Sequence, residues 1–134
     1  MAQSKSSVHV GTSGWHYRHW RGPFYPESLR ADEMLPFYAD RFDTVELNTT
    51  FYRLPPPNAA AEWARRTPRG FCFAAKGSRF ITHMKKLRDP DPALARYFEH
   101  LRGLGKKLGP IVFQLPPQWP LNLERLAEFL DALP

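Results

Sequence analysis

The chain has 134 residues, about the length of one ordinary domain. Apolar residues make up 43% and aromatic residues 14%, which supplies a packed core and excludes a largely disordered protein. No apolar run approaches the roughly 20 residues that cross a bilayer, and the first residues lack the apolar centre of a signal peptide. We therefore expect a cytoplasmic protein with no membrane partner.

The net charge of +6 favours contact with phosphates or nucleic acid, although dispersed basic charge also serves solubility. The single cysteine, Cys72, excludes an internal disulfide and a cysteine-based zinc cluster. It lies in an apolar, strand-like run, where a thiol is more often a small packing residue than a nucleophile.

Four strand-like segments alternate with four helical patterns along the chain. This order predicts an α/β protein built from βα units on a parallel sheet. The predicted strands are 8–12, 44–48, 71–76 and 111–115, and the predicted helices are 32–42, 59–66, 91–101 and 123–130.

A closed eightfold (β/α) barrel needs about 250 residues, so four units make half of one. We consider three arrangements: a fragment of a longer barrel, two associated copies, or a small open sheet. The fragment is the preferred interpretation, with residues 1–134 as its single domain. The unpaired edges of a half barrel would also favour self-association.

Start signals support the predicted helices. Asn58 and Asn122 are suitable caps for the second and fourth, and Asp91 followed by a proline suits the start of the third. Pro36 is compatible with the first helix only if it falls in the first turn.

Polar residues share one predicted face of the sheet. The segment 44–48 alternates, with valine and leucine on one face and Glu46 and Asn48 on the other. The same alternation in the third and fourth strands places Lys76 and Gln114 on the polar face. All four lie toward the carboxyl ends of their strands, where parallel α/β folds bind ligands.

These residue types suit acid/base chemistry on a small polar or anionic ligand. Glu46 would take or give a proton, and Lys76 would favour its ionised form, hold an anion or act as a nucleophilic amine. Asn48 and Gln114 would orient the ligand through paired donors and acceptors. The alternative is an internal Glu46–Lys76 salt bridge inside a filled barrel.

Histidines and aromatic residues surround the same end of the predicted sheet. His83 follows the third strand and would be either a general acid or base, or an ordinary hydrogen-bonding residue. No pair among His16, His19, Glu46 and His83 has diagnostic ligand spacing, so no metal is predicted. The aromatic residues would stack on a sugar or base, helped by arginines, or form a hydrophobic lid. They are Trp15, Tyr17, Trp20, Phe51 and Tyr52, with Arg18 and Arg53 beside them.

Several motifs in this order resemble the YecE-like family, known as domain of unknown function 72, over nearly the whole chain. The motifs are Gly11-Thr-Ser-Gly-Trp15 with Tyr17 and Trp20; Phe37-Tyr38-Ala39 with Phe42; Val45-Glu46-Leu47-Asn48-Thr49-Thr50-Phe51-Tyr52-Arg53; Phe71-Cys72-Phe73-Ala74-Ala75-Lys76; Ile81-Thr82-His83; Leu108-Gly109; and Gln114-Leu115-Pro116-Pro117.

The resemblance implies a TIM-type barrel of about twice this length, of which this chain would be the N-terminal half. By the family pattern the other half would add further polar strand ends. The resemblance also adds Thr82 to the expected substrate-binding residues. It implies no established substrate, reaction or cofactor, because the family is biochemically uncharacterised, and likeness to other barrels is only an analogy.

We therefore predict an acid/base enzyme with Glu46, Lys76 and His83 as its catalytic residues. Two alternatives remain: a nucleic-acid-binding or nuclease-like barrel, and a non-catalytic accessory protein. The nucleic-acid hypothesis predicts binding that weakens steeply with salt. Its phosphate contacts would be Arg18, Arg21, Arg53, Arg79, Lys85 and Lys86.

Overall fold

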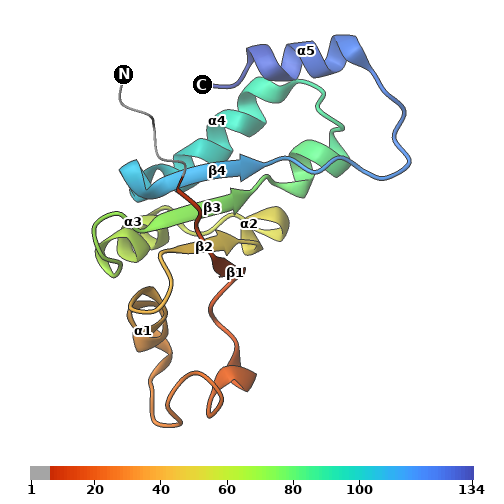
Figure 1. Cartoon of the computed structure of the whole chain (residues 1–134). Helices are drawn as coiled ribbons and strands as arrows, with labels where there is room; N and C mark the ends of the chain where they lie inside the picture. Colours follow the sequence, from red (N-terminus) through yellow and green to blue (C-terminus); the bar gives the residue numbers. More distant parts are fainter. Residues whose placement is uncertain (1–6) are drawn as a thin grey trace.

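The four strands form one parallel sheet in chain order, as the computed structural model of residues 7–134 shows (Figure 1). Val45 lies between Thr12 and Phe73 on the neighbouring strands. The predicted α/β class and the parallel sheet are confirmed. The strands are β1 (Gly11–Ser13), β2 (Thr44–Leu47), β3 (Cys72–Lys76) and β4 (Leu108–Val112).

Both outer strands are displaced from their predicted positions. β1 begins at Gly11, because Val8 and Val10 precede the ladder and are 85% and 67% exposed. β4 begins at Leu108, three residues before the predicted start. It includes a glycine and a proline, and because both are weak strand formers, the apolar pattern indicated only the residues after them. Gln114 consequently lies beyond β4, and the prediction that strand alternation places it on the polar face was wrong.

Between and after the strands, residues 7–134 form five α-helices and four helical turns of the 3-10 or π type. Pro36 is the third residue of α1, so it falls in the first turn as its chemistry requires. The α-helices are α1 (Met34–Ala39), α2 (Thr49–Tyr52), α3 (Pro57–Arg65), α4 (Pro90–Leu101) and α5 (Leu123–Asp131). The turns are η1 (Arg18–Trp20), η2 (Ala31–Glu33), η3 (Phe80–Met84) and η4 (Arg102–Lys107).

One of the three predicted helix starts is confirmed, and the other two helices begin earlier than predicted. The Asn122 side chain accepts a hydrogen bond from the Arg125 N–H at 3.1 Å, which confirms the start of α5. Asn58 is not a cap, because α3 already begins at Pro57. The sequence predicts that α4 starts at Asp91 and the proline after it, but the helix begins at Pro90, in the Asp-Pro pair just before.

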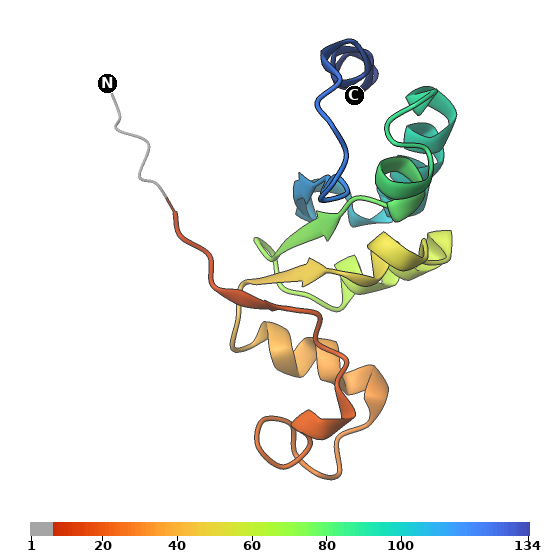
Figure 2. The ribbon, with the colours of Figure 1, turned by 90° about the vertical axis from the view of Figure 1, so that its right-hand side faces the viewer.

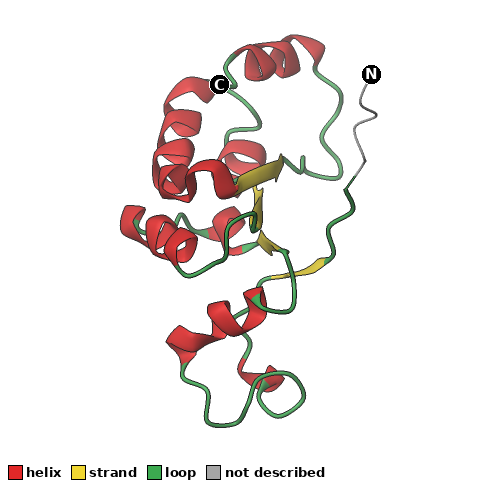
Figure 3. Ribbon diagram, turned by 60° about the vertical axis from the view of Figure 1, so that its left-hand side comes forward, coloured by secondary structure: helices red, strands yellow, loops and turns green. Residues whose placement is uncertain are grey.

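The helices α1, α3 and α4 cover the same face of the sheet (Figures 2 and 3). Val45, Leu47, Phe73 and Ala75 point into that layer and are 1% exposed or less. This agrees with the predicted alternation. Residues of the opposite face are partly exposed, namely Thr44, Glu46, Cys72, Ala74 and Lys76.

Helical spacing in 123–130 predicts a buried stripe of Leu123, Leu126, Ala127 and Leu130, but of these four only Leu126 packs against the core. Leu123 and Leu130 are 68% and 55% exposed, and Ala127 is also exposed. Phe129 is the buried residue instead, with its ring centroid 5.0 Å from that of Phe113. Periodicity identified the helix but not which side faces the core, because that depends on where the preceding loop places it.

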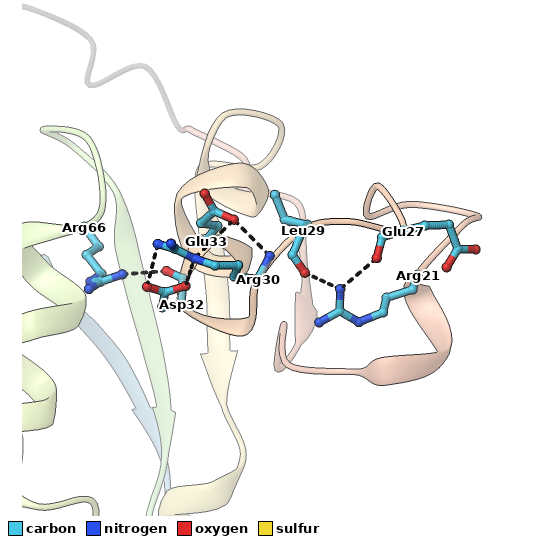
Figure 4. Close-up of polar contacts among 7 residues, drawn as sticks. All are labelled: Arg21, Glu27, Leu29, Arg30, Asp32, Glu33 and Arg66. Atoms are coloured by element: carbon cyan, nitrogen blue, oxygen red, sulfur yellow. Dashed lines mark hydrogen bonds and ion pairs between the residues drawn. The ribbon is translucent and has the colours of Figure 1, made fainter.

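The long loop between β1 and α1 is held by polar contacts of its own (Figure 4). The Arg21 guanidinium donates to the Leu29 carbonyl oxygen, and Arg30 forms two 3.1 Å hydrogen bonds with the Asp32 carboxylate. Arg66 of α3 donates to the Asp32 carbonyl oxygen at 2.5 Å. The loop is therefore attached to α3 as well as to its own strand.

Within residues 7–134, no helix combines the length and the apolar character that a bilayer crossing requires.

Candidate functional site

A cavity of about 400 Å³ opens at the carboxyl ends of β1 and β2. Four of its lining residues are predicted site residues. This is the location that parallel α/β sheets use for ligands. The lining residues are Gly14, Trp15, His16, Tyr17, Glu46, Leu47, Asn48, Thr49 and Trp63.

Glu46 is the acidic group of this cavity. It lies opposite Ser13 in the β1–β2 register, and the Ser13 hydroxyl donates to its Oε1 at 3.0 Å. The backbone N–H of Gly14 donates to the Glu46 carbonyl oxygen at 2.9 Å. The carboxylate is therefore held from the neighbouring strand, while Oε2 accepts no such bond from Ser13.

Aromatic residues form the wall of the cavity opposite the strand ends. The Trp15 ring meets Trp63 of α3 edge-on, with centroids 5.4 Å apart. The Tyr17 hydroxyl donates to the Ser13 carbonyl oxygen. Trp20 does not line this cavity and packs on Tyr17, with centroids 4.8 Å apart. Trp20 also packs on Phe24 and Tyr25, so it contributes to the packing of the loop and not to the lining of this cavity.

A second group of predicted residues surrounds Phe51 of α2. The Lys76 Nζ lies 4.5 Å from the centroid of the Phe51 ring, a cation–π contact. The His83 ring meets Phe51 edge-on at 5.2 Å. The buried Thr82 hydroxyl lies 2.8 Å from His83 Nδ1. Lys76, Thr82 and His83 are thus brought together around Phe51, which was expected to stack on a ligand.

Thr50 fixes the ends of two strands and was not anticipated from the sequence. Its buried hydroxyl lies 2.7 Å from the Leu47 carbonyl oxygen and 2.6 Å from that of Lys76. The Tyr97 hydroxyl donates to the same Lys76 oxygen at 2.9 Å. Burial raises the pKa of Tyr97 to about 12. No sequence pattern distinguished Thr50 from the threonine before it.

The alternative, a Glu46–Lys76 salt bridge, is absent from the described part of the chain, where no ion pair within 4.0 Å includes either residue. Lys76 contacts Phe51 and Glu46 contacts Ser13 instead. The two charges are therefore not neutralised by each other.

The other predicted residues lie apart from Glu46. Tyr52 and Arg53 line a separate cavity of about 360 Å³ beside α4, and Gln114 is exposed beyond β4. Trp63, which no motif singled out, takes the place expected of a second stacking residue in the Glu46 cavity. Across residues 7–134, no three histidine, cysteine or carboxylate side chains converge closely enough to hold a metal ion.

The family described as "Protein of unknown function DUF72" matches residues 9–134. The chain belongs to the DUF72 family. It is 31% identical over 129 residues to the UPF0759 protein YecE of Escherichia coli K12, covering 95% of this chain and 44% of that protein. It is 25% identical to the UPF0759 protein YunF of Bacillus subtilis, covering 90% of this chain and 44% of that protein.

Solved DUF72 structures support the same fold. A DUF72 protein from Thermotoga maritima superposes with a TM-score of 0.81 at 29% identity, covering 96% of this chain and 53% of that one. A DUF72 protein from Enterococcus faecalis gives a TM-score of 0.62 at 25% identity, covering 74% of this chain and 41% of that one. The chain spans about half the length of these DUF72 relatives.

Proposed function

We propose that this DUF72 chain is the N-terminal half of a TIM-type barrel that binds and transforms a small polar or anionic metabolite by acid/base chemistry. The observation that carries the proposal is Glu46, a partly buried carboxylate in a cavity with Trp15, Tyr17 and Asn48. A carboxylate in a partly apolar pocket at the strand ends is suited to proton transfer.

The half-barrel part of the proposal rests on the asymmetry of the sheet. Helices cover one face, and the other face carries small or polar residues such as Thr44, Cys72 and Ala74. In a closed barrel that face would form the interior, which side chains from all strands fill. The greater length of the relatives supplies enough chain for the remaining strands.

Within the site each residue has a distinct proposed role. Glu46, held by Ser13 through Oε1, would exchange a proton with the ligand through Oε2. The Asn48 amide would orient polar groups of the ligand, and Trp15 and Tyr17 would pack against its carbon skeleton. These contacts favour a ligand with a ring or short carbon chain that carries hydroxyl or carbonyl groups.

Lys76 and His83 would act on the negatively charged part of the ligand. Both contact Phe51, the ammonium group over the ring and the imidazole edge-on to it. Lys76 would attract the anion, and His83 would act as a second acid or base. Thr82 positions His83 through the 2.8 Å contact between its hydroxyl and Nδ1.

The proposal is tested by ligand-induced stabilisation followed by mutagenesis. Thermal shift with sugar phosphates and hydroxy acids should identify stabilising compounds, and their binding should be lost in Glu46→Gln and Lys76→Met. In the complete barrel the same changes should abolish turnover while the melting temperature stays nearly constant. Glu99→Gln, at an exposed carboxylate on α4, is the matched control.

Two results would contradict the proposal. Loss of folding in both variants would assign Glu46 and Lys76 to the stability of the sheet. Binding of nucleic acid that weakens steeply with salt, with no response to small metabolites, would favour the nucleic-acid-binding alternative.

A further inference from the structure

A second cavity lies between α2, η3 and α4 and shares no lining residue with the Glu46 cavity. Its volume is about 360 Å³. Buried Ile81 and Tyr97 contribute to its lining, and Arg53, Arg96 and His100 also border it. The cavity therefore combines an apolar surface with basic groups, and it is distinct from the cavity that contains Glu46.

The charge of this cavity is not balanced by the protein. No carboxylate lines it. Within residues 7–134, neither Arg53 nor Arg96 forms an ion pair, whereas Arg30, Arg65 and Arg66 each pair with a nearby carboxylate. An arginine remains charged at every physiological pH and offers a planar set of donors that matches a phosphate. Two such groups at one cavity favour an anionic ligand.

His100 adds a further polar group to the cavity. Its Nδ1 lies 2.6 Å from the carbonyl oxygen of Pro55. Because a carbonyl oxygen only accepts, Nδ1 carries the proton and donates. Nε2 is then left to accept from a ligand in the neutral ring, or to donate to one in the protonated ring.

Two of the aromatic side chains that line this cavity are exposed to solvent. Tyr52 is 65% exposed and Phe80 is 48% exposed. Tyr52 also meets the Phe51 ring edge-on, with centroids 4.9 Å apart. Exposed rings beside unpaired arginines are suited to stacking on a flat ring while the guanidinium groups hold an attached anion.

We propose that this cavity binds a nucleotide, with its phosphate on Arg53 and Arg96 and its base against Tyr52 or Phe80. A simple inorganic anion would leave the aromatic rings unused, and a neutral aromatic compound would leave the arginines unpaired. The shared chemistry is a planar base carrying a phosphate, which a free mononucleotide or the end of a single strand would supply.

Calorimetric titration at low salt tests this with adenosine 5′-monophosphate, adenosine and inorganic phosphate. The monophosphate should bind about tenfold or more tightly than either of the other two. Arg53→Met and Arg96→Met should each weaken its binding about tenfold, and Tyr52→Ala should weaken it less. Arg102→Met, an exposed arginine that does not line the cavity, is the matched control and should leave binding unchanged.

The variants also separate this site from the proposed acid/base site, since Glu46→Gln should not affect nucleotide binding. Titration with a 5′-phosphorylated tetranucleotide shows which of the two ligands the cavity prefers. If it binds more tightly than the monophosphate, the ligand is the end of a single strand; if it binds more weakly, the ligand is a free mononucleotide. Equal affinity for adenosine and its monophosphate would overturn the proposal. The proposal would also be overturned if the monophosphate did not bind, or if Arg102→Met weakened its binding as much as Arg53→Met and Arg96→Met do. Circular dichroism checks that each variant is folded.

Discussion

The two faces of the sheet differ sharply although each strand contributes to both. On the helix-covered face, Val45, Leu47 and Phe73 are 1% exposed or less. On the opposite face, Glu46 and Lys76 are partly exposed and form no ion pair with each other in the described chain. Residues that maintain the fold and residues available for chemistry are therefore separated by a single step along a strand.

This separation predicts that the effect of a substitution depends on the face it changes. The largest loss is expected for Phe73→Ala, which removes a fully buried ring and should reduce the free energy of unfolding by about 3–5 kcal/mol. Cys72→Ala, its neighbour on the other face, should cost less than about 1 kcal/mol. Urea denaturation of both variants measures the contrast, and equal losses would contradict it.

Thr50→Val tests the contact that joins the carboxyl ends of β2 and β3. The change leaves the carbonyl oxygens of Leu47 and Lys76 without the Thr50 hydroxyl, which should cost about 1–3 kcal/mol. Thr49→Val, at the exposed neighbouring position, is the matched control and should have a much smaller effect. Similar losses in the two variants would mean that Thr50 does not hold the strand ends together.

Because Tyr25 and Tyr97 are buried, we expect the protein to lose stability at high pH. Burial raises the pKa of Tyr25 and of Tyr97 to about 12, against an ordinary value of 10.0. Between these two values the unfolded chain releases the phenol protons before the folded one does. The folded state then binds more protons, so the free energy of unfolding decreases as the pH rises from about 10 to about 12.

Melting temperatures measured across this pH range check the prediction. Tyr97→Phe should lower the melting temperature at pH 7, because the hydrogen bond to the Lys76 carbonyl oxygen is lost, and should flatten the decline above pH 10. Tyr52→Phe, at an exposed tyrosine, should leave the decline unchanged. A slope that is the same in Tyr97→Phe would show that this phenol is not protected in the fold.

The smallest effect on stability is expected for Glu46→Gln on the open face. An amide retains the acceptor that Ser13 uses, so the free energy of unfolding should change by no more than about 0.5 kcal/mol. Chemical denaturation measures this change. A loss of several kcal/mol would place Glu46 with the residues that maintain the fold and would remove the basis for its proposed role.

Sequence patterns were sufficient for the class of fold and for the two faces of β2 and β3. The alternation of Val45 and Leu47 with Glu46 is a local property of an extended backbone, so it holds in any sheet that buries one side. The same reasoning failed for Gln114, because β4 ends at Val112 and the ladder decides where the extended geometry stops. Helical spacing likewise identified α5 but not the side that is buried, since Leu123 and Leu130 are exposed.

The grouping of the site residues was decided by long-range contacts. Glu46 shares a cavity with Trp15 and Trp63 because a loop after β1 and a helix after β2 converge on one strand end, while Lys76 contacts Phe51. Side-chain alternation follows from backbone geometry and is encoded within a few residues. Which side chains share a cavity depends on strand register and helix docking, and these depend on contacts across the whole chain.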